Sequence, residues 1–430
     1  MTRARSAAVV VFVAFAFAYF LSALLRAVTA TLAPVFSSEL GLRSGDLGLL
    51  AGAYFFGFAA MQLPLGRALD RFGPRRTLLA LLALAVLGCA GFALAAKLPA
   101  LIAARALTGA GVAACLMAPL TCYRSLFSPA AQLRANSWML MTGSLGMLAS
   151  TLPVQWLLPQ LGWRGLFWAV AALLALAIAL VAWLAPRGTA VPPAAGDAAA
   201  EIAGGAAVGA AVGAVVGAVV GAAGGYAEIV RHPLFRRLAP LGFTVYGGLI
   251  AVQSLWAGPW LTRVAGWTAQ QAAQGLFAIN LAMLLAFLSW GAVLPRLARR
   301  GVSATQLIAW GVPPGLLLLA ANVWLGGAAG AAHWAAWCVA CTFVSVSQPA
   351  VGAAFPPAQA GRALSAFNLV IFSGVFSIQW GIGLLIDAMQ ALGLAEDVAL
   401  RVAFGVFLLM GVAAYGWFLH GGRQAADNPA

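Results

Sequence analysis

Hydrophobic positions along the chain form long unbroken runs, and the polar positions gather in short clusters between them. Twelve runs have roughly the 20 residues that a membrane-crossing helix needs. They lie at residues 8–33, 47–65, 77–96, 100–121, 136–158, 165–185, 238–260, 274–294, 305–325, 331–354, 365–387 and 399–420. Because lipid offers no partners for free backbone groups, such runs predict helices. The pattern therefore predicts an all-α polytopic membrane protein with twelve transmembrane helices.

The first run begins like a secretory signal, with a basic start, an apolar stretch and small residues (MTRARSAAVVVFVAFAFA). It continues to about Pro34, which is longer than the apolar core of a signal and long enough to span a bilayer. We therefore expect an uncleaved first helix.

Arginines are distributed unevenly between the loops on the two sides of the predicted membrane. Loops on the side of the N-terminus carry most of them, including clusters within 67–76, 231–237 and 296–300. The opposite side carries Arg43, Lys97, Arg164, Arg263 and Arg401. Since cytoplasmic loops are enriched in Lys and Arg, this bias places both termini in the cytoplasm. We expect a monomeric, multi-pass protein of the bacterial inner membrane, surrounded by lipid.

Composition narrows the classes of function. Of the 430 residues, 63% are hydrophobic and only 8% are charged, whereas soluble domains carry about 25% charged residues. This excludes a soluble enzyme, and the net charge of +14 belongs to loop arginines and not to a nucleic-acid surface. No nucleophile–base pair, metal motif or nucleotide loop is present, so we expect neither enzyme activity nor a cofactor. The five cysteines lie in or beside apolar runs, which predicts buried thiols and no disulfides.

The predicted spans divide the chain into two halves. We expect an N-terminal half at residues 1–185, a cytoplasmic linker at 186–237, a C-terminal half at 238–420 and a cytoplasmic tail at 421–430. Within the linker, residues 203–225 form a Val/Gly/Ala repeat with glycines at every fourth position. As a thirteenth span, this repeat would place the arginines of the second half on the outer side. It is therefore interpreted as part of the linker.

The two halves resemble each other in sequence. The segment that begins at Gly41 aligns without gaps with the segment that begins at Gly266. Gly66 then corresponds to Gly291 and Arg71 to Arg296, all at a constant offset of 225 residues. Two pseudo-symmetric six-helix halves are the natural interpretation, and parallel repeats of this kind hold a substrate between them near the midplane.

A charged motif lies between the second and third predicted spans. It reads GRALDRFGPRR and contains Gly66, Asp70, Arg71, Gly73, Arg75 and Arg76. This resembles the loop 2–3 signature of the major facilitator superfamily, G-x-x-x-D-R-x-G-R-R/K, and departs from it at Pro74. The carboxylate can accept from free N–H groups at a helix start, and the arginines can bind carboxylates or last-turn carbonyls. The resemblance implies a gating element and not a substrate site. In the second copy, Pro295 replaces the acid, which predicts an asymmetric latch.

A second resemblance lies at the start of the fourth span. The stretch from Arg105 to Ala113 is similar to the superfamily pattern R-x-x-x-G-x-G-x-A, with Thr108 in place of a common glutamine. The resemblance implies a role for Arg105 in conformational or proton coupling. The alternative is an arginine near the outer end that reaches to the membrane interface.

Arg26 lies about two-thirds of the way across the first span. Charges inside a membrane usually face a cavity and have a partner. None of the ten acidic residues lies in the middle of a predicted span. An anionic substrate could therefore supply the missing charge, because arginine binds carboxylate or phosphate through two parallel hydrogen bonds. The alternatives are pairing with Asp46 or Asp387, or satisfaction by helix carbonyls and water.

Other polar side chains within the spans could also line a substrate cavity, because buried amides and Tyr or Trp tips need partners. They are Tyr54, Gln62, Tyr246, Gln253, Trp256, Asn280, Gln348, Asn368 and Gln379. We assign Tyr54, Tyr246, Gln253, Trp256, Asn280 and Asn368 to substrate binding together with Arg26. Hydrogen bonding between helices is the alternative for each of them.

The prediction that results is a secondary transporter that works by alternating access. We expect uptake of a small organic anion, coupled to protons or driven by exchange. A proton-coupled exporter of lipophilic compounds is the alternative, although the GP pair that such exporters usually carry in span 5 is absent between Thr142 and Pro153. Metal-ion uptake is a weaker alternative, because the Met, Cys and His residues of spans 5 and 10 lack a tight spacing.

Overall fold

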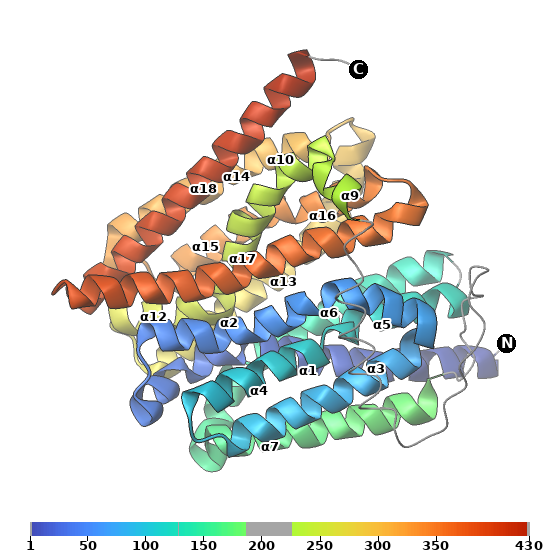
Figure 1. The fold of residues 1–430 in the computed structure, drawn as a ribbon, viewed down its shortest axis with the longest axis horizontal. Coiled ribbons are helices and arrows are strands. Elements are labelled where there is room, and N and C mark those ends of the chain that lie inside the picture. The colour runs from blue at the N-terminus through green and yellow to red at the C-terminus, as the bar shows by residue number, and fades with distance from the viewer. Residues whose placement is uncertain (1, 128, 186–225, 428–430) are drawn as a thin grey trace.

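The computed structural model describes residues 2–127, 129–185 and 226–427, and these residues form helices and no strands. Figure 1 shows two groups of helices, the N-terminal half below and the C-terminal half above. The repeat at 203–225 lies outside the described residues.

The N-terminal half contains seven α-helices, some of which are segments of one span. They are α1 (Thr2–Leu40), α2 (Ser44–Ala60), α3 (Gln62–Leu94), α4 (Leu98–Gly111), α5 (Ala114–Leu126), α6 (Pro129–Ala149) and α7 (Leu152–Leu184). Two of these helices change direction at a glycine: α3 at Gly73 (φ 76°) and α7 at Gly162 (φ 62°). The second span thus ends inside α3, before Gly73, and the third begins after it.

The C-terminal half begins with two short helices and a span that is partly π-helical. These elements are α9 (Ala227–Arg231), α10 (Pro233–Leu241), η2 (Gly242–Tyr246), α11 (Gly247–Ala251), η3 (Val252–Trp256), α12 (Ala257–Pro259) and η4 (Trp260–Val264). The remaining elements are α13 (Ala269–Arg299), α14 (Ala304–Leu325), η5 (Gly326–Ala328), α15 (Ala331–Cys341), η6 (Thr342–Val346), α16 (Ser347–Ala353), α17 (Pro357–Ala391) and α18 (Glu396–Asp427). The helix α10 begins inside the predicted linker and continues into the seventh span.

Eleven segments of the described chain are long and apolar enough to cross a membrane. The fifth predicted span (136–158) is divided between α6 and the first part of α7, and α7 is counted once although it turns at Gly162. The helices also expose large apolar side chains, among them Trp183 and Trp324. Tryptophans of this kind are typical of the lipid interface. The fold is therefore that of an all-α, multi-pass membrane protein.

The backbone repeats where the sequence repeats. Gly41 and Gly266 have positive φ angles of 62° and 70°, which favour glycine, and each precedes a helix by three residues. At both helix starts the backbone N–H of the residue before the helix donates to a side chain three residues later, from Arg43 to Asp46 at 3.1 Å and from Thr268 to Gln271 at 2.9 Å. Only the Thr268 side chain also accepts in return, from the backbone N–H of Gln271. The offset of 225 residues is therefore a repeat of structure as well as of sequence.

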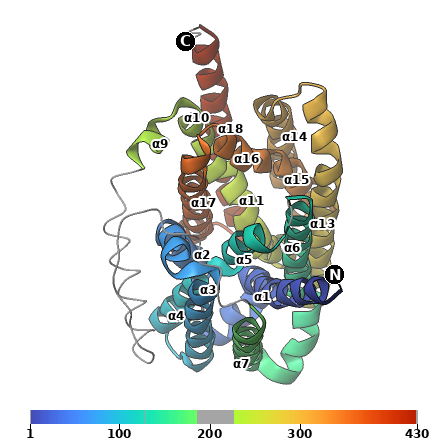
Figure 2. The ribbon, with the colours of Figure 1, turned by 90° about the vertical axis from the view of Figure 1, so that its right-hand side faces the viewer.

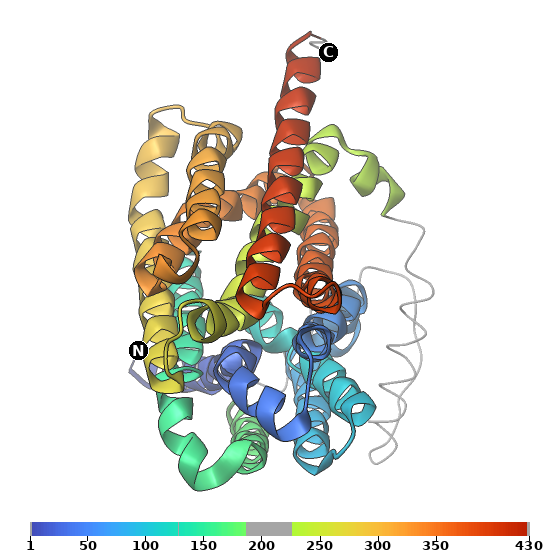
Figure 3. The same ribbon diagram turned by 90° about the vertical axis from the view of Figure 1, so that its left-hand side faces the viewer.

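The halves are joined most closely by α2 and α17 at one end of the molecule, which we call the closed end. It lies at the left of Figure 1 and faces the viewer in Figure 3. Glycines allow this approach. A Cβ atom added at Gly48 would lie 2.4 Å from the backbone oxygen of Gln379, and one at Gly383 would lie 2.3 Å from that of Ser44. Span 1 meets span 7 in the same way, because a Cβ at Gly258 would lie 2.5 Å from the oxygen of Ala30.

The opposite end carries the N-terminus and the loop 2–3 motif, and it faces the viewer in Figure 2. Here the ends of spans 4 and 10 pack within their own halves. The helix α5 packs on α1, α3 and α6, and α16 packs on α10, α14 and α17. The two halves are thus held together mainly at the closed end.

Candidate functional site

Arg26 extends from α1 to the boundary between the two halves. Its guanidinium interacts with the side chain of Tyr54 from α2, and electrostatically with Tyr19 from α1 and Tyr246 from the C-terminal half. The Cζ atom lies 5.7 Å from the ring centroid of Phe58, a cation–π distance. The Nε atom is buried and has no hydrogen-bond partner among the described residues. The site therefore combines a half-buried cation with three tyrosines from both halves.

The carboxylates that the sequence offered as partners are engaged elsewhere. Asp46 pairs with Arg43 and caps α2, and Asp387 accepts hydrogen bonds from the backbone N–H groups of Ser44 and Gly45. In the described part of the chain the ion pairs are Arg43–Asp46 and Arg263–Glu396, both at the closed end. Arg26 therefore has no carboxylate partner among the described residues.

Arg105 is also buried, and its side chain is only 1% exposed. One nitrogen, Nη2, donates to the backbone oxygen of Leu25 at 3.2 Å and to the hydroxyl of Thr29 at 2.6 Å. The Cζ atom lies 5.2 Å from the centroid of the Tyr54 ring. The idea that Arg105 reaches to the membrane interface is thus wrong, because aromatic side chains and α1 enclose its guanidinium.

Tyr54 lies between the two arginines. Its ring faces Arg105, and its hydroxyl donates to the backbone oxygen of Ser22 at 3.1 Å, one turn before Arg26. The hydroxyl is thus free to accept from Arg26, with which it interacts. Tyr54 is fully buried and fixes the relative position of α1, α2 and α4.

Four of the predicted binding residues in the C-terminal half have partners within that half. The amide of Gln253 donates to Asn280 Oδ1 at 2.9 Å, and Asn280 donates to the backbone oxygen of Leu276. The Trp256 indole donates to the backbone oxygen of Gln379 and is fully buried. Asn368 accepts from Gln348. Hydrogen bonding between helices, the alternative to substrate contact, thus occurs for these groups. Among the predicted residues of this half, Tyr246 is the one that interacts with Arg26 in the described chain.

Tyr19 and Phe58 also belong to this site, although neither is among the residues predicted from the sequence. Tyr19 precedes Arg26 by seven residues, so the two share one face of α1. Phe58 follows Tyr54 by four residues, and the centroid of its ring lies 4.5 Å from that of Phe372 in α17. Helical spacing from the predicted residues could have found both.

The loop 2–3 motif lies at the end opposite the closed end. The positive φ of Gly73 ends the second span, and Pro74 starts the third. Arg75 donates to the backbone oxygen of Ala182 in the last turn of α7, as expected for an arginine of this motif.

Other residues of the loop 2–3 motif make fewer contacts. Arg71 and Arg76 are exposed, and an added Cβ at Gly66 would meet nothing within 4 Å. In the second copy, Arg296 donates to the backbone oxygen of Ala292 in its own helix. The side chain of Asp70 lies outside the described part of the structure.

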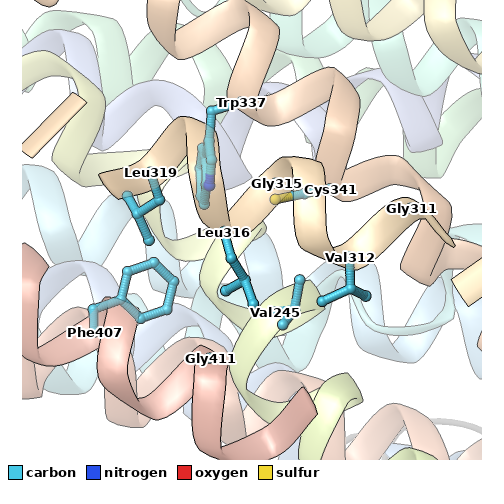
Figure 4. A pocket seen from close by; sticks show the side chains of 10 residues that line it. All are labelled: Val245, Gly311, Val312, Gly315, Leu316, Leu319, Trp337, Cys341, Phe407 and Gly411. Carbon is cyan, nitrogen blue, oxygen red and sulfur yellow. The ribbon is translucent and has the colours of Figure 1, made fainter. Parts of the chain in front are cut away.

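A hollow within the C-terminal half is separate from this site. Figure 4 shows it between α14, α15, α18 and the start of the seventh span. Its lining residues are Val245, Gly311, Val312, Gly315, Leu316, Leu319, Trp337, Cys341, Phe407 and Gly411. The lining contains no charged side chain, and the glycines provide the space, so it is a packing gap and not a polar binding site.

Comparison with known proteins places the chain in a family. The model of the Major Facilitator Superfamily matches residues 15–378. Over 63 residues the chain is 36% identical to the probable sulfoacetate transporter SauU of Cupriavidus necator, a match that spans 15% of each chain. The fold of the present chain is similar to that of a bacterial homologue of the human lysosomal transporter Spinster, with a TM-score of 0.71, 18% identity and 98% of both chains covered. A D-xylose–proton symporter gives a TM-score of 0.68 at 15% identity, over 95% of this chain and 96% of that one. The chain therefore belongs to the major facilitator superfamily of membrane transporters.

Proposed function

We propose that this secondary transporter moves a small organic anion by alternating access, with Arg26 as the residue that binds it. The observation that carries the proposal is the half-buried guanidinium at the boundary of the halves, which has tyrosines but no carboxylate around it among the described residues. A charge in the membrane that lacks a partner is costly. An anion that enters between the halves removes that cost and gains charge-assisted hydrogen bonds.

The surrounding tyrosines favour a small, oxygen-rich anion. The phenol groups of Tyr19 and Tyr246 can donate to a carboxylate, sulfonate or phosphate oxygen while the guanidinium holds the anionic group. The aromatic face of Phe58 covers the guanidinium from one side. The name of the relative from Cupriavidus necator, a probable sulfoacetate transporter, agrees with a carboxylate- or sulfonate-bearing substrate.

Alternating access fits the unequal ends of the molecule. The closed end would seal one side of the membrane while the opposite end admits the anion, and the loop 2–3 motif would gate that opposite end in the other state. With both termini in the cytoplasm, the opposite end would face the cytoplasm. We propose uptake across the bacterial inner membrane by two six-helix halves, coupled to protons or driven by exchange.

Ligand-induced stabilisation tests the proposal. The purified full-length protein is melted with sulfoacetate, dicarboxylates, phosphate esters and lipophilic cations, and the same panel is applied to Arg26→Gln. Saturation at about 100 times Kd stabilises a binding protein by roughly 2.7 kcal/mol. We expect such a shift for an anion in the wild type and its loss in Arg26→Gln.

The matched control is Arg43→Gln, which removes an exposed arginine at the closed end. Its response to anions should equal that of the wild type. If lipophilic cations stabilise the wild type and Arg26→Gln equally, and anions stabilise neither, the anion proposal is wrong and an exporter of lipophilic compounds replaces it.

A further inference from the structure

Arg105 brings a second positive charge behind the proposed anion site. It is fully buried, and its Nε and Nη1 atoms have no hydrogen-bond partners among the described residues. The residues around it are aromatic or neutral: its Cζ atom lies 5.2 Å from the Tyr54 ring centroid, 5.9 Å from that of Phe92 and 6.0 Å from that of Phe167. Its charge is therefore not cancelled by a described carboxylate.

A single tyrosine separates this charge from Arg26. The Tyr54 ring faces Arg105, and the Tyr54 side chain interacts with Arg26. Arg105 is also fastened to the turn of α1 that carries Arg26, through the Leu25 carbonyl and the Thr29 hydroxyl. The two guanidinium groups are thus held in a fixed relation within one half of the protein.

We infer that Arg105 makes the Arg26 site selective for dianions over monoanions, as a positioning and specificity-determining residue that does not touch the substrate. The inference rests on the proposed function and names its substrate class: small organic anions with two negative charges, such as a molecule that carries both a sulfonate and a carboxylate. Arg26 binds one anionic group directly, and the field of Arg105 acts on the whole charge of the ligand.

Coulomb's law gives the expected size and form of the effect. A unit charge roughly 10 Å away, in a medium with an effective dielectric constant of about 20, changes anion binding by on the order of tenfold for each ligand charge. The effect of Arg105 on a dianion is therefore the square of its effect on a monoanion. A purely structural role would weaken both ligands by the same factor.

The test uses two probes of similar shape, sulfoacetate as the dianion and isethionate as the monoanion, in calorimetric binding to the full-length protein. We expect Arg105→Gln to lower the affinity for isethionate about tenfold and the affinity for sulfoacetate about 100-fold. Arg105→Lys keeps the charge and should restore most of the preference for sulfoacetate.

Thr29→Asp provides a variant that leaves Arg105 in place. Thr29 already accepts from Arg105 at 2.6 Å, so an aspartate there would neutralise the guanidinium. Thr29→Asp should reproduce the unequal losses of affinity for the two probes that are expected of Arg105→Gln. If Arg105→Gln does not fold, Thr29→Asp still tests the inference, because its ion pair with Arg105 supports folding.

The outcomes separate the two proposals. If Arg105→Gln weakens the binding of sulfoacetate and isethionate by the same factor, or does not weaken it, the selectivity inference is overturned. Anion binding by the wild type would still uphold the proposed function. Failure of both probes and of the wider anion panel to bind the wild type overturns the two together.

Discussion

The two ends of the molecule hold their charged and polar groups in different ways. At the closed end hydrogen bonds cross between the halves: Asp387 of α17 caps the start of α2, and Arg263 donates to Ser37 and Ser44. At the opposite end, Arg75 bonds Ala182 within the N-terminal half. Similar residue types therefore join the halves at one end and brace a single half at the other.

Under the proposed alternating access, this difference would separate the groups that change the balance between the two states from those that do not. Contacts that cross between the halves must break when the closed end opens, whereas contacts within a half can persist through the cycle. Under the proposed mechanism, substitutions at the closed end change the balance between the two states. Substitutions in the described part of the loop 2–3 motif change the stability of one half. The following predictions test that distinction.

The largest effect is expected at Gly48. Gly48→Ala places a Cβ atom 2.4 Å from the Gln379 oxygen, so α2 and α17 must separate, at a cost of about 3 kcal/mol. Hydrogen exchange at the start of α2 should become faster, as measured by mass spectrometry. The control is Gly381→Ala on α17, where an added Cβ meets nothing within 4 Å. Equal exchange in the two variants would contradict the tight approach at Gly48.

Asp387 is next in expected effect. Its carboxylate accepts from Ser44 N at 3.1 Å and from Gly45 N at 2.9 Å, across the boundary of the halves. Asp387→Leu leaves these N–H groups without an acceptor and removes a favourable charge at a helix start, which should cost about 2 kcal/mol. Asp387→Asn retains one acceptor and should lose about half as much. Exchange of these two amides is the measurement, and unchanged protection in the leucine variant would refute the cross-half cap.

Gly73 tests the opposite end. Its φ of 76° and ψ of 164° are strained for any side chain, so Gly73→Ala should lower the free energy of unfolding by about 1 kcal/mol. Gly66→Ala in the same motif meets open space and should be neutral or stabilising. Thermal unfolding measures both. Exchange at the start of α2 should stay as in the wild type, and a change there would break the distinction between the two ends.

The smallest effect is expected at the Arg263–Glu396 ion pair. The atoms are 2.8 Å apart, but the side chains are 18% and 44% exposed, so water and salt screen the pair. Glu396→Gln should cost at most about 1 kcal/mol, and the loss should shrink in high salt. Arg263→Gln should cost more, because it also removes the bonds to Ser37 and Ser44. Equal melting temperatures for the two variants would show that the serine bonds contribute nothing.

Much of the fold could be predicted because lipid constrains the sequence strongly. Each span must be an apolar run long enough to cross the bilayer, and the repeat between Gly41 and Gly266 is visible as aligned residues. The prediction of twelve runs differs from the eleven membrane-length segments of the described chain at the fifth span, which a turn at Thr151 (φ −103°, ψ −106°) divides between α6 and α7. Such turns depend on a single residue, and hydropathy averages over about 20.

The site could be predicted only in part. Arg26 stood out because a charge inside an apolar run is rare, and the structure places it among tyrosines of both halves. The interactions of Gln253, Asn280 and Trp256 were not predictable, because a side chain's hydrogen-bond partner lies on another helix, at a rotation that hydropathy does not set. For the same reason, the burial of Arg105 against Tyr54 required the packing of α2 and α4.

The amino-acid sequence alone was enough to predict a chain that spans a membrane, has two related halves and carries an arginine within the first span. These properties depend on the composition and order of residues along the chain. They can be recognised because lipid requires each spanning segment to be a long apolar helix. Folding in three dimensions sets which polar groups satisfy one another, which arginines lack a carboxylate partner among the described residues, and which end of the molecule is closed. Those outcomes depend on distances of a few ångströms between residues far apart in sequence, where one Cβ atom at Gly48 would change the contact.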